Sequence, residues 1–286
     1  ANLVGCIARA AGQVAGVFGT LGYSLPTRSQ AGSLTTFEPT ELAPLLAELA
    51  GVGGTVAAME VSSAGLRQER VAGLEFDVAV WLNLTRDHLD FHVDMEDYFA
   101  AKRTLQALLR ATPPGRRVIG ADDPFMARLA ASPRAGDITF GLGGDRDVTA
   151  SGVRVDVSGI AFTLSSPVGR VDVRLPLIGR HNLSNALAAA AVATALGWPL
   201  DAVVEGLAAA RPLPGRLEPV DVGIGQAVFV DYAHTPDALE KVLQALKELT
   251  AGRLLAVFGC GGDKDPGKRP LMGEIAGRLA DIPIVT

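Results

Sequence analysis

Cysteine is scarce in this chain, since only Cys6 and Cys260 occur among its 286 residues. The two lie far apart and lack the spacing of a metal site, so we expect a reducing environment and no disulfides. No apolar run is long enough to cross a membrane, and the first residues do not resemble a signal peptide. We therefore expect a cytoplasmic protein with no membrane partner.

A basic excess is also missing. The sequence carries 26 Lys and Arg against 31 Asp and Glu, a net charge of −5, and shows no basic stripe. These features exclude nucleic acid as an expected partner. An anionic small substrate is compatible with this balance if Arg and Lys side chains gather locally. We expect the protein to act as a monomer.

Apolar strands that alternate with helices are present instead, and they predict an α/β fold with a mostly parallel sheet flanked by helices. A chain of this length can form one or two domains. In the first part the predicted strands are Val14–Phe18, Thr55–Val61, Phe76–Leu82 and Arg117–Ala121, and the predicted helices are 1–12, Thr40–Ala50 and Met95–Arg110, the last with Asp94 as N-cap.

The pattern then changes. Three half-alternating segments between Gly and Ser-Pro turns predict a small antiparallel β-meander, over Asp147–Asp156, Gly159–Ser165 and Arg170–Leu177. The helices predicted next are Leu183–Leu196, capped by Asn182 or Ser184, and Leu200–Ala210. Arg211–Arg216 is typical of a linker, and a new α/β unit follows it. The predicted elements of that unit are Ala227–Val230, Pro236–Leu249, Leu254–Phe258, Pro270–Leu279 and Ile282–Val285.

The richest cluster of reactive side chains is Asn83–His92, which follows a strand and holds two of the chain's four histidines. Strand ends are where open α/β sheets bind ligands. Glu60 ends a second strand, expected to be a neighbour, and Lys102 lies fourteen residues after His88 on the next helix. A carboxylate and an imidazole together suit a divalent cation that bridges phosphates. A salt-bridged loop with a helix-facing lysine explains the same residues equally well.

Other polar segments each allow two interpretations. Ser62-Ser63 and Gln68–Arg70 could hold an anionic substrate or form a capped turn, while Thr35-Thr36 is typical of an ordinary polar loop. Asp231–Asp237 could contact a ribose or a metal, or cap the next helix. The glycine-rich loop Gly259–Lys264 could offer backbone N–H groups to an anion. No complete G-x-x-x-x-G-K-[ST] phosphate loop occurs in the chain.

Taken together, these motifs resemble those of the Mur ligase family. Eight segments match in the family's order and cover nearly the whole chain, so the resemblance is highly specific. They are Gly19–Tyr23, Ala58–Ser63, Asn83–His92, Tyr98–Lys102, Asn182–Ala186, Pro214–Arg216, Asp231–Pro236 and Gly259–Asp263. The match is closest to the members that add the third amino acid to a UDP-muramoyl dipeptide. It implies a central ATP-binding domain over residues 1–213 and the first part of a Rossmann-like ligase domain over 214–286.

The resemblance also implies a role for each matching residue. Lys102 resembles the lysine that CO2 carbamylates in this family, and with Glu60 and His88 it would act in catalysis and hold Mg²⁺. Buried lysines shift their pKa readily enough to supply the neutral amine that this modification needs. The residues that resemble contacts to the dipeptide substrate are Thr35, Thr36, Ser62, Gln68 and Arg70. Those that resemble contacts to the nucleotide are Asn182, Asn185, Arg216 and Asp231.

The chain departs from the family pattern at its ends and at two internal positions. The family's phosphate loop would stand just before Ala1, and the motif that selects the incoming amino acid would follow Thr286. The N-terminal domain that holds the uridine is missing as well. Ala64 replaces a usual histidine, and Phe37-Glu38 interrupts the usual Thr-Thr-Pro. We therefore expect a fragment that is inactive alone, with altered details in its substrate contacts.

The implied reaction is ATP-dependent amide-bond formation through an acyl phosphate. It would add diaminopimelate or lysine to UDP-MurNAc-L-Ala-D-Glu in peptidoglycan precursor synthesis, with Mg²⁺ as cofactor and ATP as co-substrate. Two alternatives stay open. One is another ligase of the same superfamily, of the folylpolyglutamate or cyanophycin type, and the other is a non-catalytic module that binds a nucleotide sugar.

Overall fold

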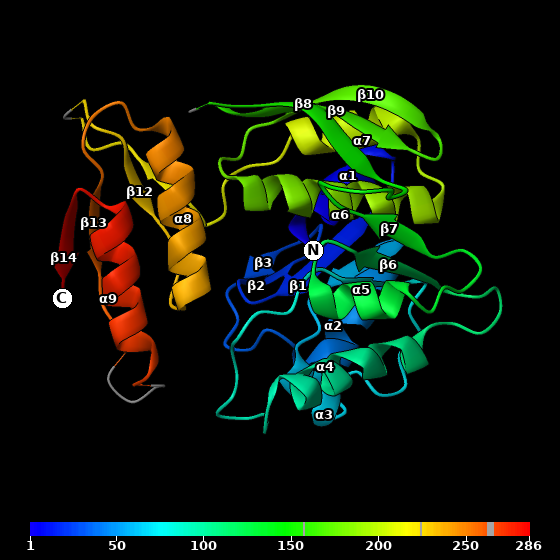
Figure 1. Cartoon of the computed structure of the whole chain (residues 1–286). Helices are drawn as coiled ribbons and strands as arrows, with labels where there is room; N and C mark the ends of the chain where they lie inside the picture. Colours follow the sequence, from blue (N-terminus) through cyan, green and yellow to red (C-terminus); the bar gives the residue numbers. More distant parts are fainter. Residues whose placement is uncertain (157, 224, 262–265) are drawn as a thin grey trace.

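The expected α/β architecture is confirmed by the computed structural model, which describes residues 1–156, 158–223, 225–261 and 266–286. Parallel strands flanked by helices and an antiparallel meander form the larger part, and a smaller α/β part stands beside it (Figure 1). Within the described ranges no helix is long and apolar enough to cross a membrane.

The first sheet has the strand order β3-β2-β1-β4, in which only β1 and β4 are parallel. Every residue of β1 is buried, in agreement with its apolar sequence. The sequence pattern did not predict the hairpin from β1 to β2. This hairpin depends on Gly22, where φ is 104° and a Cβ would lie 2.0 Å from the Gln30 carbonyl oxygen. The elements are Asn2–Ala10 (α1), Ala15–Gly19 (β1), Gly22–Ser24 (β2), Ser29–Gln30 (β3), Pro39–Gly51 (α2) and Val56–Met59 (β4).

A second sheet, β5-β6-β7, is wholly parallel. No backbone ladder joins β4 to β5 in the described residues, so the expected single sheet is divided into two ladders. The helix predicted over Met95–Arg110 is correct only to Arg103, and it tightens into a 3-10 turn over Thr104–Leu108 (η1). The predicted Asp94 N-cap is confirmed, since its carboxylate accepts from Asp97 N at 2.8 Å. The other elements are Ser63–Arg67 (α3), Val78–Trp81 (β5), Met95–Arg103 (α4), Arg116–Gly120 (β6), Pro124–Ala130 (α5) and Ile138–Phe140 (β7).

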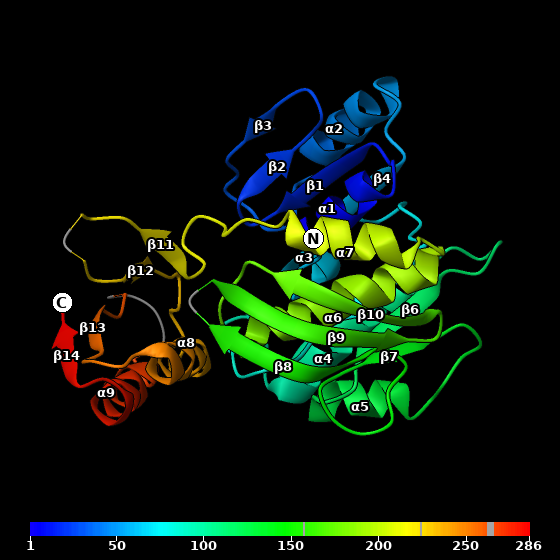
Figure 2. The ribbon, with the colours of Figure 1, turned by 90° about the horizontal axis from the view of Figure 1, so that it is seen from above.

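The predicted meander forms a third sheet, β8-β9-β10, whose strands lie beside the alanine-rich helix α6 (Figure 2). That helix also contacts β5, β6 and β7, and its alanine-rich stretch from Ala186 to Ala195 lies at the centre of the largest core. The predicted cap at Asn182 or Ser184 is wrong: the helix begins at Arg180, after Gly179 at φ 93°, and the Asn182 amide donates back to the Ile178 carbonyl. The elements are Thr149–Asp156 (β8), Gly159–Ser166 (β9), Gly169–Leu175 (β10), Arg180–Leu196 (α6) and Leu200–Ala208 (α7).

The C-terminal part has a core of its own, in which Leu239, Leu243 and Met272 are buried. Its strand β13 pairs with β14 in parallel, and Thr235 caps α8 by accepting from Ala238 N. These features support the boundary at 213/214, which stays a prediction. The elements are Glu218–Val220 (β11), Val228–Val230 (β12), Pro236–Leu249 (α8), Leu255–Phe258 (β13), Lys268–Leu279 (α9) and Ile282–Val285 (β14).

Gly206 brings α7 against α1. A Cβ there would lie 2.4 Å from Ile7 Cα and 2.6 Å from Ile7 N, so backbone must move to admit it. Gly206→Ala should lower the free energy of unfolding by about 1–3 kcal/mol, measured by urea denaturation. Gly273→Ala on α9 is the matched control, because its Cβ meets nothing within 4 Å. It should stabilise by roughly 0.5–1 kcal/mol. Equal stability of the two variants would contradict the close packing.

Candidate functional site

Lys102 and His88 both lie against the ring of Tyr98. The Lys102 Nζ atom is 5.2 Å from the centroid of that ring, and the His88 ring meets it edge-on at 5.8 Å. Lys102 is half-buried, and burial lowers the pKa of its amine, while the Asp87 carboxylate acts in the opposite direction. Burial also raises the pKa of Tyr98 to about 12, so its phenol stays neutral. Burial therefore shifts the Lys102 amine toward its neutral form, beside a neutral aromatic ring.

The backbone at His88 is unusual, because a φ of 56° places this non-glycine residue in the left-handed region. Three hydrogen bonds hold the turn. His88 N donates to Asp87 Oδ1 at 2.8 Å, and the His88 carbonyl accepts from Phe91 N at 3.0 Å and from His92 N at 2.8 Å. Such conformations persist where the surroundings over-determine them, and they gather at functional sites.

Glu60 directly follows β4 and is held by the turn after β1. Its Oε2 accepts from Thr20 N and from Thr20 Oγ1, both at 3.0 Å. The Thr20 hydroxyl lies 3.0 Å from the hydroxyl of Thr35. The structure thus brings Glu60 together with Thr35, and Lys102 together with His88, as two pairs. No hydrogen bond or ion pair links the pairs in the described residues, and those residues contain no cluster of three His, Cys, Asp or Glu that could hold a metal. The predicted convergence of Glu60, His88 and Lys102 stays a prediction.

The predicted substrate contacts Thr36, Ser62 and Arg70 form a connected group. Buried Thr36 accepts from Ser62 N at 2.9 Å and lies 3.1 Å from the Ser62 hydroxyl. Arg70 Nη1 donates to the Thr36 carbonyl at 2.9 Å, and its Nε lies 3.0 Å from the Glu38 carboxylate. Ser62 also caps α3 by accepting from Gly65 N. Gln68, predicted with this group, stands exposed at the end of α3.

The four predicted nucleotide contacts form two pairs, one on each side of the linker. On α6 the Asn185 amide donates to Asn182 Oδ1 at 3.3 Å. Asp231 accepts from Leu217 N at 2.7 Å, and the Arg216 guanidinium lies 5.7 Å from the Tyr232 ring centroid.

His181 lies at the start of α6, next to Asn182. Burial lowers the pKa of its imidazole, Asp231 raises it, and Lys241 and Arg216 lower it further. Charges of the C-terminal part therefore act on this imidazole. The glycine-rich segment Gly259–Lys264, predicted as an anion site, lies partly outside the described residues.

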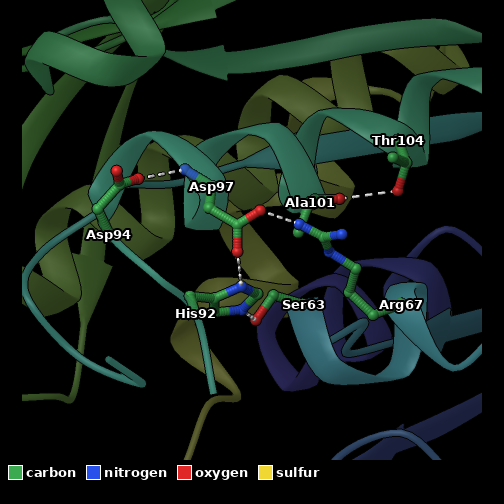
Figure 3. Close-up of polar contacts among 7 residues, drawn as sticks. All are labelled: Ser63, Arg67, His92, Asp94, Asp97, Ala101 and Thr104. Atoms are coloured by element: carbon green, nitrogen blue, oxygen red, sulfur yellow. Dashed lines mark hydrogen bonds and ion pairs between the residues drawn. The ribbon is translucent and has the colours of Figure 1, made fainter. Parts of the chain in front are cut away.

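His92 is a site residue that the sequence interpretation placed only within its segment, without a role. Its ring is buried between Ser63 and Asp97, which come from two different helices (Figure 3). Asp97 lies only five residues after His92, at the start of a predicted helix, so the sequence offered a signal for the contact between these two residues. Nothing in the sequence pointed to Ser63, which is 29 residues away.

Two family models match the chain. Residues 2–193 match the Mur ligase middle domain, and residues 215–286 match the Mur ligase glutamate ligase domain. The chain therefore belongs to the Mur ligase family.

Two curated relatives and one solved structure carry the same name. The UDP-N-acetylmuramoyl-L-alanyl-D-glutamate–2,6-diaminopimelate ligase of Geobacter metallireducens is 47% identical over 288 residues, which cover 99% of this chain and 56% of that protein. The Pseudomonas aeruginosa protein of that name is 47% identical over 278 residues, covering 96% of this chain and 56% of that protein. A solved structure of a ligase of that name is 34% identical with a TM-score of 0.75, over 99% of this chain and 59% of that one. The chain thus spans a little over half the length of these relatives.

Proposed function

We propose that the protein to which this chain belongs is the ATP-dependent ligase that adds diaminopimelate to UDP-MurNAc-L-Ala-D-Glu. The observation that carries the proposal is the agreement of whole-chain relatives on this activity, together with the clustering of the motif residues around Tyr98, Glu60 and Thr36. The names of those relatives favour diaminopimelate over lysine. They also favour this ligase over the folylpolyglutamate type, which resembles the chain at 17% or 21% identity and so shares the fold alone.

Lys102 would carry the modification that the family resemblance implies. Its burial lowers the pKa of the amine, which makes the neutral nucleophile more abundant at a given pH. The amine would add to CO2, forming a nitrogen–carbon bond and releasing one proton, to give a carbamate. This change replaces a neutral amine with an anion beside Tyr98 and His88.

Two of the three proposed donors, the oxygens of a Lys102 carbamate and of the Glu60 carboxylate, would suit a hard divalent cation such as Mg²⁺, and the His88 imidazole would complete the set. Glu60 has one oxygen engaged by Thr20, and its Oε1 accepts no hydrogen bond from the described residues. Bound Mg²⁺ would neutralise charge on the ATP phosphates.

The dipeptide substrate would lie between the proposed metal ligands and the connected group of Thr36, Ser62 and Arg70. Arg70 would seat an anionic group of the dipeptide, with Thr36 and Ser62 orienting it through their hydroxyls. The D-glutamate side-chain carboxylate would attack the γ-phosphorus of ATP, and ADP would leave. The amine of diaminopimelate would then attack the acyl carbon and lose a proton, and phosphate would leave with the former carboxylate oxygen.

The amino acid is tested with the full-length protein, ATP and UDP-MurNAc-L-Ala-D-Glu, by following ADP release with diaminopimelate or lysine. We expect release that depends on diaminopimelate and is much slower with lysine. Release that is faster with lysine would overturn the choice of amino acid, and release with neither would overturn the ligase. This chain alone should be inactive, because it contains no complete phosphate loop.

Gly19→Ala should disturb Glu60 selectively. A Cβ at Gly19 would lie 2.5 Å from Glu60 Cδ, so the carboxylate must leave its place beside Thr20. The Mg²⁺ concentration for half-maximal ligation should then rise by about 10–100-fold, as it does when partners of metal ligands are lost. Gly51→Ala, whose Cβ meets nothing within 4 Å, is the control. An unchanged Mg²⁺ requirement in folded Gly19→Ala would remove Glu60 from the metal site.

A further inference from the structure

The strongest feature outside the assigned roles is the buried polar network of His92 (Figure 3). Its side chain is only 1% exposed. The Nδ1 atom lies 3.1 Å from Asp97 Oδ2, and the Nε2 atom lies 2.9 Å from the Ser63 hydroxyl. Both ring nitrogens are therefore engaged, one by a residue of α4 and the other by a residue of α3.

The two partners determine which ring nitrogen of His92 carries the proton. A carboxylate only accepts hydrogen bonds, so His92 Nδ1 must carry the proton that faces Asp97. The hydrogen bond from His92 is the main reason that the pKa of Asp97 lies below its usual range, so Asp97 stays ionised. In the neutral imidazole, Nε2 is then the acceptor and the Ser63 hydroxyl donates to it. This series of hydrogen bonds joins α3 to α4 through one ring, beside the ion pair that Arg67 of α3 forms with Asp97.

The His92 network reaches both halves of the candidate site. Ser63 follows Ser62, which contacts Thr36 in the substrate group. On the other side the His92 ring stacks on Tyr98, with centroids 4.8 Å apart and planes at 19°. Tyr98 is the ring against which Lys102 and His88 lie. His92 is thus the side chain that touches both the substrate segment and the aromatic support of the proposed metal ligands.

The order Ser63, His92, Asp97 is also that of a hydrolase triad, in which the serine is the nucleophile. Burial argues against that role here. Ser63 is 3% exposed and lies in the first turn of α3. A nucleophile must reach an electrophilic carbon, and this hydroxyl is covered by the packing of the two helices.

We infer that His92 is a positioning residue, which fixes the substrate-contact segment of α3 at a set distance from Tyr98 and so from Lys102 and His88. The inference rests on the proposed ligase function. A misplacement of about 1 Å between reacting groups can cost about a hundredfold in rate. Loss of the network should therefore lower kcat, while the dipeptide still binds through Thr36, Ser62 and Arg70.

The test compares variants of the full-length protein. His92→Phe keeps a ring to stack on Tyr98 and removes both hydrogen bonds, and Ser63→Ala removes only the bond to α3. His92→Gln keeps an amide that can reach Ser63. Asp94→Ala is the matched control, because it removes the N-cap of α4, a hydrogen bond from Asp97 N, and leaves both side-chain contacts of His92 in place.

We expect kcat to fall by about 10–100-fold in His92→Phe and in Ser63→Ala. The dissociation constant for UDP-MurNAc-L-Ala-D-Glu, measured by calorimetry without ATP, should stay within about threefold, a change worth under 1 kcal/mol. His92→Gln should recover part of kcat, and Asp94→Ala should lower the melting temperature but keep kcat. The carbamate signal of Lys102, followed by NMR with isotope-labelled bicarbonate, should weaken in His92→Phe.

Several outcomes would overturn the inference. They are a kcat close to that of the wild type in both network variants, an equal loss in Asp94→Ala, or a loss of affinity as large as the loss of kcat. Hydrolysis of an activated ester that Ser63→Ala abolishes would make Ser63 a nucleophile instead. If His92→Phe does not fold, Ser63→Ala carries the test. A wild-type protein that fails to ligate would overturn the proposed function, and the carbamate signal would still report whether His92 positions Lys102.

Discussion

Lys102→Ala should abolish measurable ligation by the full-length protein, with kcat reduced by at least about a hundredfold to a thousandfold. The reason is that the proposed carbamate supplies the negative charge at this place in the site. The fold should persist, because the amine is half-buried and packs mainly against Tyr98. Short carboxylic acids or added bicarbonate should restore part of the rate, since the missing group is chemically a carboxylate. Lys102→Glu should rescue weakly, as its shorter stem misplaces the oxygens.

The control is Lys247→Ala, which removes an exposed lysine of α8 that is paired with Asp281. It should leave kcat unchanged. A Lys102→Ala protein that retained most of its kcat would show that Lys102 is not in the metal site. A large loss that no carboxylic acid repairs would assign Lys102 a different role, that of an ammonium point charge on the phosphates.

Arg70→Ala should raise the KM for UDP-MurNAc-L-Ala-D-Glu by about 30–100-fold, equivalent to roughly 2–3 kcal/mol for a charge-assisted hydrogen bond. Arg70 is largely buried and is held by the Thr36 carbonyl and the Glu38 carboxylate, so its guanidinium is already oriented. Arg70→Lys should not restore the affinity, because a single ammonium cannot reproduce the planar fork of donors.

Steady-state kinetics with varied dipeptide concentration measures this effect. Arg278→Ala is the control, since Arg278 forms an exposed ion pair with Glu240 away from the proposed site. Its KM should match that of the wild type. An unchanged KM in Arg70→Ala would mean that Arg70 only braces the loop at Glu38, and that the segment around Ser62 is a capped turn, the other interpretation open from the sequence.

Long elements with a clear period could be predicted from the sequence. The helix Pro236–Leu249 has the predicted bounds, and the meander appears where alternation predicted it. Short elements could not, because their stability comes from partners elsewhere in the chain. The hairpin at Gly22 and the short helix α5 are examples. The start of α6 was misplaced because Asn182 bonds backward to Ile178 instead of capping.

The sequence motifs name candidate residues for the site, but they do not predict how the side chains are arranged. The motifs identify Lys102, His88 and Glu60, yet their contacts depend on how two separate ladders pack. The Tyr98 ring contacts both Lys102 and His88 because of the turn at His88. No pattern in the sequence predicts the left-handed backbone of that turn. The same holds for the bond between His92 and Ser63, which joins segments distant in sequence.

The central claim, ligation through an acyl phosphate, is tested most directly by following an oxygen atom. The full-length protein would be given ATP, diaminopimelate and UDP-MurNAc-L-Ala-D-Glu with heavy oxygen in the D-glutamate side-chain carboxylate. Mass spectrometry of the released phosphate should find one heavy oxygen in each phosphate formed with product, because the carboxylate oxygen that attacks phosphorus leaves with it. Unlabelled phosphate, released together with the tripeptide product, would contradict the account.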